Sequence, residues 1–196
     1  MSVRKAGIRR KTKETNIAVD LNIDGSGRYA IETGLPFLNH MLELLAKHAL
    51  MDLNLRATGD LDVDYHHTVE DIGLVLGSAL NKALGSRSGI NRYGWSLAPM
   101  DEALSRVAVD LGGRPYLVYQ IANRKRKILA FDLQLIEEFM RAFCTEARMN
   151  LHICQLYGKD VHHAFESVFK GLALALRSAC ARNTRVKGVP SSKGRL

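Results

Sequence analysis

The sequence lacks the long apolar runs that membrane-spanning helices require, since none reaches roughly 18 to 20 residues. Its three cysteines are an odd number without a C-x-x-C spacing, which argues against a disulfide framework and against a thiolate metal site. The basic segment MSVRKAGIRRKTKET is not followed by an apolar stretch, so we expect no signal peptide and a cytoplasmic protein. No linker rich in proline, glycine and serine divides the 196 residues, and a hydrophobic fraction of 46% is typical of a globular chain.

The charge balance is basic, with 28 Lys and Arg against 20 Asp and Glu and a net charge of +8. Such a balance favours an anionic partner, which could be nucleic acid or a phosphorylated metabolite. The basic residues are dispersed and lack the interleaved aromatic residues of a base-stacking surface. Charge alone therefore does not decide between nucleic acid and a phosphorylated metabolite as the partner.

An internal repeat organises the chain. HHTVEDIGLVLGSAL at 66–80 and HHAFESVFKGLALAL at 162–176 lie 96 residues apart and share six of fifteen positions, including both histidines and the glutamate. Upstream, with a shift of two residues, 37–55 aligns with 135–153, which places His40 opposite Glu138. We interpret this pattern as a duplication, with an N-terminal half at 1–92 and a C-terminal half at 93–196.

Hydrophobic periodicity assigns the same elements to both halves. Each half contains an amphipathic helix, a short alternating strand and a second helix, predicted at 37–49, 51–57 and 66–84 and at 133–147, 149–155 and 162–182. Extended segments precede them at 6–12, 16–23 and 28–33, with DGSG as a hairpin turn, and at 103–111 and 116–121, joined by GGRP. Gly85 stands where a helix cap belongs. The prediction is an α+β fold of two βββαβα halves, each a sheet with two helices on one face, packed as one unit.

The repeated histidines and glutamates have the spacing of metal ligands. Residues four apart share a helix face, so the first histidine and the glutamate of each HHxxE element form a pair of ligands, which we call a clip. The second histidine is rotated by about 100° around the helix, so it must bind a different ion or another partner. We expect an exchange in which each clip takes its other ligands from the opposite half or from another subunit. One predicted site contains His40, His67, His162 and Glu166, and its mate contains His66, Glu70, Glu138 and His163.

A single histidine is more often structural than a ligand, and we interpret His152 and, from spacing alone, His48 in that way. The repeated set is different, because buried carboxylates without a cation are costly. Imidazole and carboxylate ligands without thiolate suit Mn, Fe, Ni or Zn, and a site with open positions favours Mn or Fe over a closed structural zinc.

Several further residues could bind an anion or transfer a proton. Arg114 follows a glycine turn, Arg92 precedes a strand, and the tail residues Ser191, Ser192 and Lys193 could cradle a phosphate. Asp101 and Glu102 are placed at the head of a strand, where a solvated turn is the alternative. Glu14 lies among cations, where a surface ion pair is the default.

Eight motifs together carry a family resemblance. The segments RKTKETNI, GLPFLNHML, DYHHTVED, NRYG, APMDEAL, LGGRP, HHAFESVFK and PSSKG, spread from Arg10 to Gly194, resemble the imidazoleglycerol-phosphate dehydratases. The resemblance implies a lyase of ribosomal protein S5 domain 2-like fold with two Mn²⁺ per active site, assembled as a 24-subunit cage with sites between subunits. It implies dehydration of erythro-1-(imidazol-4-yl)glycerol 3-phosphate to 3-(imidazol-4-yl)-2-oxopropyl phosphate in histidine biosynthesis.

The resemblance also assigns residues. The implied metal ligands are His40, His66, His67, Glu70, Glu138, His162, His163 and Glu166. The implied substrate contacts are Glu14, His40, His48, His66, Glu70, Arg92, Arg114, His162, Ser191, Ser192 and Lys193. The position of Glu138 is commonly a histidine in the family, so we expect its site to persist with altered affinity. Asn39 and Leu44 are milder departures, from an aspartate and a polar residue.

The chemistry explains why a metal would be needed. The proton on carbon 2 is not acidic, because no carbonyl neighbours it. A substrate held as its imidazolate can expel the hydroxyl on carbon 3 and form a diazafulvene-like intermediate, and loss of the carbon 2 proton then gives an enol that becomes the ketone. For acid-base catalysis we rank Glu14 first, followed by Glu166 and Asp101.

Two other functions remain as alternatives. A metal-dependent phosphatase would normally use several aspartates to hold paired metals, and this chain has no such cluster. An RNA-binding module agrees with the basic charge but leaves the repeated HHxxE unexplained. We therefore expect a small phosphorylated imidazole as the substrate, with neither nucleic acid nor a membrane as a partner.

Overall fold

Strands with alternating side chains form two separate four-stranded sheets in the computed structural model, which describes residues 3–121 and 127–195. The first sheet has the order β1-β2-β4-β3, and these strands span Lys5–Lys11, Thr15–Asn22, Asp52–Gly59 and Tyr29–Glu32. The second has the order β5-β6-β10-β7, with spans Tyr93–Met100, Ala103–Asp110, Asn150–Tyr157 and Tyr116–Gln120. In each sheet two antiparallel pairings are followed by one parallel pairing. The two halves therefore repeat one topology, as predicted.

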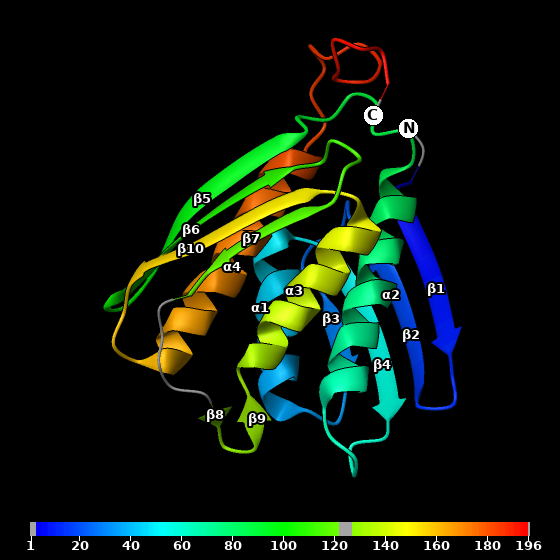
Figure 1. The fold of residues 1–196 in the computed structure, drawn as a ribbon. Coiled ribbons are helices and arrows are strands. Elements are labelled where there is room, and N and C mark those ends of the chain that lie inside the picture. Colours follow the sequence, from blue (N-terminus) through cyan, green and yellow to red (C-terminus); the bar gives the residue numbers. More distant parts are fainter. Residues whose placement is uncertain (1–2, 122–126, 196) are drawn as a thin grey trace.

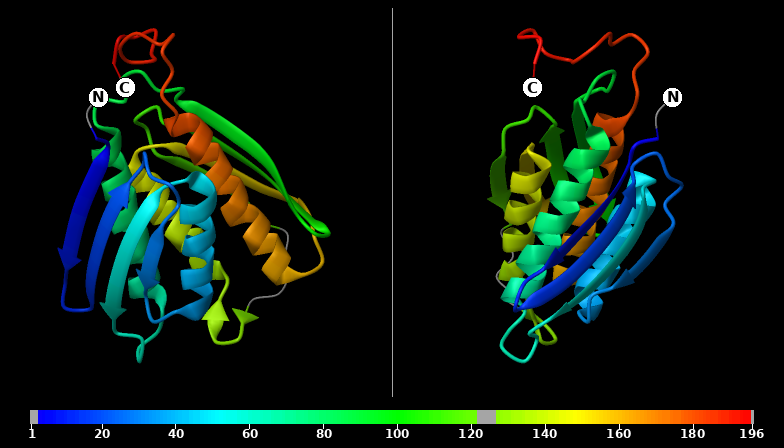
Figure 2. Two further views of the ribbon diagram at one scale, coloured as in Figure 1. Left: turned by 180° about the vertical axis from the view of Figure 1, so that it is seen from behind. Right: turned by 90° about the vertical axis from the view of Figure 1, so that its right-hand side faces the viewer.

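Four helices lie between the sheets (Figures 1 and 2), namely α1 Pro36–Ala49, α2 His66–Leu84, α3 Gln134–Ala147 and α4 Val161–Cys180. The helices α2 and α4 pack on the inner faces of their own sheets, α2 also packs against α3, and α4 packs against α1. A Cβ atom on Gly73 of α2 would lie 2.7 Å from the carbonyl oxygen of Phe139, so only glycine allows this approach to α3. Helices of opposite halves thus pair closely, and both halves contribute to one apolar core.

All four helices begin at the same end of the molecule, which is the lower end in Figure 1. The Asp160 side chain caps α4 by accepting hydrogen bonds from the backbone N–H groups of His162 and His163. Gly85 ends α2 with a positive φ of 54°, which confirms the predicted cap. Because the histidine-rich repeats begin α2 and α4, the fold gathers both of them at this end. No helix in the described part of the chain has the length and apolarity needed to cross a membrane.

Three details of the predicted fold were wrong or incomplete. DGSG is not a hairpin turn, because β4 lies between β2 and β3 and pairs with both. Arg92 precedes a strand, as predicted, but no bounds were predicted for this strand, β5. The small hairpin of β8 (Lys127–Ile128) and β9 (Phe131–Asp132) was not predicted. Asp101 and Glu102 lie directly before β6, as predicted, and they form the exposed turn between β5 and β6, which was the stated alternative.

Candidate active site

Three side chains from α1 and α4 converge at the lower end of the molecule. His40 Nε2 lies 2.8 Å from Oε1 of Glu166, and His162 Nε2 lies 3.2 Å from the same oxygen. Their potential ligand atoms all lie within 4.8 Å of one another. His162 and Glu166 share a helix face because they are four residues apart, and the packing of α1 against α4 adds His40. Two imidazoles and a carboxylate suit a divalent transition metal, so this donor set fits the kind of cation that the sequence predicts.

Glu166 is ionised at neutral pH although its residue is only 8% exposed. Burial raises the pKa of this carboxyl, but hydrogen bonds from Lys170 and His40 outweigh burial and lower it to about 2. Lys170 Nζ donates to Glu166 Oε2 at 2.6 Å and also lies 2.9 Å from the sulfur of Met100. Sequence reasoning did not select Lys170, although its place one helical turn after the glutamate of HHAFESVFK was a usable signal.

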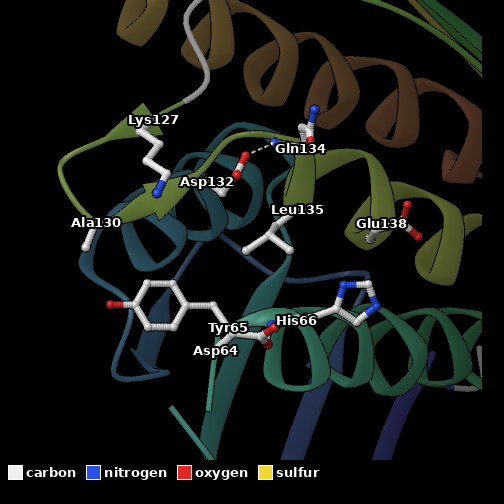
Figure 3. Close-up of a pocket in the computed structure, with 9 residues that line it drawn as sticks. All are labelled: Asp64, Tyr65, His66, Lys127, Ala130, Asp132, Gln134, Leu135 and Glu138. Carbon is white, nitrogen blue, oxygen red and sulfur yellow. Dashed lines mark hydrogen bonds between the residues drawn. The ribbon is translucent and has the colours of Figure 1, made fainter. Parts of the chain in front are cut away.

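A second group of predicted ligands lies around a cleft of about 460 Å³ between the starts of α2 and α3. His66 and Glu138 lie towards one end of this cleft, and Lys127 and Ala130 lie at the other (Figure 3). His66 Nε2 is 4.0 Å from Oε2 of Glu70, which confirms that the two share a helix face. The structure therefore brings one histidine of the first repeat close to Glu138 of the opposite half. Lys127 and Asp132 also line the cleft, and sequence reasoning missed both because the β8–β9 hairpin was not predicted.

His67 and His163 have different partners within the chain. His67 Nδ1 lies 3.0 Å from Oδ2 of Asp60, and His163 Nδ1 lies 2.8 Å from Oε2 of Glu102. The Asp60 hydrogen bond raises the pKa of His67, and the Glu102 hydrogen bond raises the pKa of His163. As predicted, these two rings point away from the histidine–glutamate pairs of their own helices. Within a single chain, however, His67 does not reach the cluster of His40, His162 and Glu166, and His163 does not reach His66, Glu70 and Glu138.

The acid-base candidates on loops also lie at the lower end. The backbone N–H of Glu14 donates to Thr12 Oγ1 at 3.0 Å, and its carbonyl accepts from the backbone of Asp60 at 3.1 Å, so the β1–β2 turn is held beside α2. Asp101 Oδ2 lies 3.8 Å from Nε2 of His163. Each candidate thus occupies the turn between the first two strands of its half and lies near a histidine of that half.

His48 lies two turns after His40 on α1. Burial lowers its pKa, and the nearby charge of Lys170 lowers it further. The imidazole is therefore neutral at physiological pH and lies near the cluster of His40, His162 and Glu166.

The predicted phosphate contacts lie at the opposite end of the molecule, where the helices finish. Arg92 binds Asp110 through Nε and Nη2, at 2.6 and 3.0 Å, and donates from Nη1 to the carbonyl of Pro190 at 2.9 Å. The backbone N–H of Lys193 donates to Ser191 Oγ at 3.2 Å, which shapes the exposed tail. Arg92 therefore attaches the segment that carries Ser191, Ser192 and Lys193. Arg114 is exposed in the β6–β7 loop, and its carbonyl accepts from the side chain of Asn150.

One chain keeps the histidine cluster and the predicted phosphate contacts far apart. The backbone N–H of Arg92 donates to the carbonyl of Ala179, near the end of α4, whereas His162 begins that helix. With a rise of about 1.5 Å per residue, these two points of α4 are on the order of 25 Å apart. The structure therefore does not unite all the predicted substrate contacts within one subunit.

The fold and the cluster define a duplicated α+β protein in which two histidines and a glutamate near the N-terminal ends of the helices could bind a metal ion. A family model described as imidazoleglycerol-phosphate dehydratase matches residues 33–176. The chain belongs to this family. It is a hydro-lyase of histidine biosynthesis, and it dehydrates erythro-1-(imidazol-4-yl)glycerol 3-phosphate to 3-(imidazol-4-yl)-2-oxopropyl phosphate.

Relatives and solved structures agree over nearly the whole chain. The imidazoleglycerol-phosphate dehydratase of Desulforudis audaxviator is 54% identical over 194 residues, which cover 99% of this chain and 98% of the relative. That of Oceanobacillus iheyensis is 50% identical, covering 99% and 100%. The crystal structure of the Staphylococcus aureus enzyme has a TM-score of 0.82 at 37% identity, covering 91% of this chain and 99% of that one. The Pyrococcus furiosus enzyme in complex with (S)-C348 also has a TM-score of 0.82, at 38% identity, covering 96% and 100%.

Proposed function

We propose that this dehydratase holds two Mn²⁺ ions per active site in the pseudo-symmetric pair of ligand sets expected from the repeat. The convergence of His40, His162 and Glu166 is the observation that carries the proposal, because only tertiary packing brings these three donors together. The proposed ligands of one ion are His40, His67, His162 and Glu166, and those of the other are His66, Glu70, Glu138 and His163.

We further propose that the complete active site lies between subunits. A small substrate cannot span the roughly 25 Å between the two points of α4 at His162 and Ala179, so one molecule cannot contact the cluster of His162 and the tail of Lys193 in a single chain. Residues from a second subunit resolve this, with the tail of one chain, together with Arg92 and Arg114, reaching the helix N-termini of another. The same exchange would supply His67 and His163 to the ligand sets that lack them.

The proposed assembly is the 24-subunit cage. Apolar side chains on the outer face of β5 support a contact between subunits, since Trp95 is 73% exposed in the single chain and Tyr93 and Leu97 are exposed beside it. Light scattering should give a mass near 24 times the 21.8 kDa of one chain. The three cysteines are free in this structure, as suits the reducing cytoplasm that we propose as the location.

The proposed mechanism assigns a task to each group of residues. When bound, the divalent ions supply positive charge that stabilises the imidazolate form of the substrate. Arg92, Arg114, Ser191, Ser192 and Lys193 hold the phosphate and thereby fix the orientation of carbons 2 and 3.

Proton transfer is assigned to carboxylates near the helix N-termini. Glu14 is exposed on a turn whose backbone is hydrogen-bonded, so we assign it the transfer of a proton at the reacting carbons. Glu166, with a pKa of about 2, is suited to holding a cation rather than to donating a proton. Asp101 remains the second candidate for proton transfer.

A complementation experiment tests the shared site. Glu166→Gln and Lys193→Ala should each abolish most ketone formation from the imidazole substrate. When the two inactive proteins are dissociated and reassembled together, roughly a quarter of the sites should combine an intact cluster with an intact tail and regain activity. Mixed assemblies that stay inactive, although each variant retains its fold and its assembled mass, would contradict a site shared between subunits.

A further inference from the structure

The four histidines of the HHxxE elements use their ring nitrogens in two different ways. In the second repeat His162 turns Nε2 towards Glu166, and in the first His66 turns Nε2 towards Glu70. His67 and His163 instead bind a carboxylate through Nδ1, at 3.0 and 2.8 Å. The second histidine of each repeat is thus anchored by the nitrogen nearer the backbone.

The chemistry of the anchor determines the tautomer. An ionised carboxylate can only accept a hydrogen bond, so the proton of a neutral ring lies on Nδ1 when Asp60 or Glu102 binds there. The lone pair then lies on Nε2, which is the far atom of the ring. In His163 this atom is 3.8 Å from the exposed Asp101, and the ring is not enclosed by its own chain.

Glu102 is itself fixed by the fold. Its Oε1 accepts hydrogen bonds from the backbone N–H groups of Lys159 and Asp160, at 3.1 and 2.7 Å, while Oε2 faces His163. Asp60 lies in the loop before α2, and its backbone N–H binds the carbonyl of Glu14. Glu102 is therefore held through its carboxylate, whereas Asp60 is held through its backbone N–H. Among the described residues, the buried Oδ1 of Asp60 has no hydrogen-bond partner, so its Oδ2 makes the contact with His67.

The two anchors do not occupy equivalent positions of the repeat. Asp60 follows β4, whereas Glu102 lies between β5 and β6, and the residue 96 positions after Asp60 is Leu156. Duplication of one ancestral contact therefore does not account for both. In both halves a carboxylate binds Nδ1 of the second histidine, but the two carboxylates come from loops at different places in the repeat.

We propose that Asp60 and Glu102 are positioning residues that hold His67 and His163 as Nδ1-protonated rings, so that Nε2 is the atom each ring offers to a divalent cation. This inference depends on the proposed ligand sets. Carboxylates that bind the second nitrogen of a metal-ligating histidine orient the ring and raise its basicity, and their loss typically costs 10–100-fold in metal affinity.

Manganese titration of the assembled, metal-stripped enzyme tests this role without an activity measurement. Electron paramagnetic resonance of free Mn²⁺ gives the affinity of each variant. Asp60→Ala and Glu102→Ala should weaken binding about 10- to 100-fold. Asp60→Asn and Glu102→Gln retain an oxygen that can accept from Nδ1–H, so they should restore much of the lost affinity.

The matched control is Asp62→Ala, which removes an exposed charge from the loop that carries Asp60. Unchanged Mn²⁺ affinity in both alanine variants would overturn the inference. An equal loss of affinity in Asp62→Ala would also overturn it, because the loss of any nearby negative charge would then explain the effect. Failure of the unmodified enzyme to bind Mn²⁺ would refute the ligand sets themselves. A lower melting temperature with wild-type Mn²⁺ affinity would show a purely structural role and would also overturn the inference.

Discussion

His40 and Glu166 are 126 positions apart in the sequence, yet Nε2 of the first lies 2.8 Å from Oε1 of the second. The contact joins α1 of the N-terminal half to α4 of the C-terminal half. The cluster is consequently a product of the packing between the duplicated halves, and neither half could form it alone.

Replacement of Glu166 by glutamine should disable the cluster. The amide loses the charge that binds a cation, and Lys170 loses its carboxylate partner. We expect a fall in Mn²⁺ affinity of at least about 100-fold, since a direct ligand should matter at least as much as the outer partners of a ligand. Metal content after dialysis measures this, with Glu137→Gln as the control, because Glu137 is a half-buried residue of α3 that pairs with Arg141.

The identity of residue 138 should tune the second ligand set. Glu138→His introduces the residue that the family resemblance leads us to expect at this position, and we expect Mn²⁺ binding to persist with a changed affinity. Glu138→Gln should weaken binding by about tenfold or more, because an amide is a poorer ligand than a carboxylate or an imidazole. Isothermal titration with Mn²⁺ compares the variants, and equal affinity in Glu138→Gln and the unmodified enzyme would exclude residue 138 as a ligand.

Glu14→Gln should separate catalysis from metal binding. Loss of a general acid or base typically costs about 10²- to 10⁴-fold in rate, so kcat should fall by this amount while Mn²⁺ content stays unchanged. Steady-state kinetics and metal analysis of the same preparation provide the measurement, and Glu32→Gln on the edge strand β3 is the control. An unaltered kcat would refute the role of Glu14.

Asp52 should stabilise the fold in a pH-dependent way. A hydrogen bond from Arg28 and others from the backbone at Ser26 and Arg28 lower its pKa below the ordinary value. Its contribution is therefore present above the unfolded-state pKa of about 3.9 and is lost as the pH falls towards the lower folded-state value. Asp52→Asn should cost about 1 kcal/mol at pH 7 and much less at pH 3.

Unfolding curves at a fixed protein concentration measure this difference. The control is Asp20→Asn, because Asp20 forms an exposed ion pair with Arg9 and such pairs contribute little. A cost for Asp52→Asn that is equal at both pH values would show that ionisation of Asp52 is not involved.

Local patterns were sufficient to predict all four helices and the duplicated topology. The apolar periodicity of α1 to α4 and the HHxxE spacing are properties of short segments, so they can be derived from the residues alone. Strand pairing is a long-range property, and here the prediction failed at DGSG, which looks like a hairpin turn although β4 inserts between β2 and β3. The bounds of β5 could not be predicted because Gly94, Trp95 and Pro99 obscure its alternation, which becomes evident once it pairs with β6.

The sequence by itself determined the family, the helices and the residue types that could bind a cation, because these depend on composition and on spacings within a few turns of chain. Only the tertiary structure decided that His40 meets His162 and Glu166, that Lys170 and Met100 lie beside them, and that Asp60 and Glu102 anchor the remaining histidines. These contacts join segments remote in the sequence, and the packing of helices and loops that brings them together is encoded by the whole core and not by any single motif.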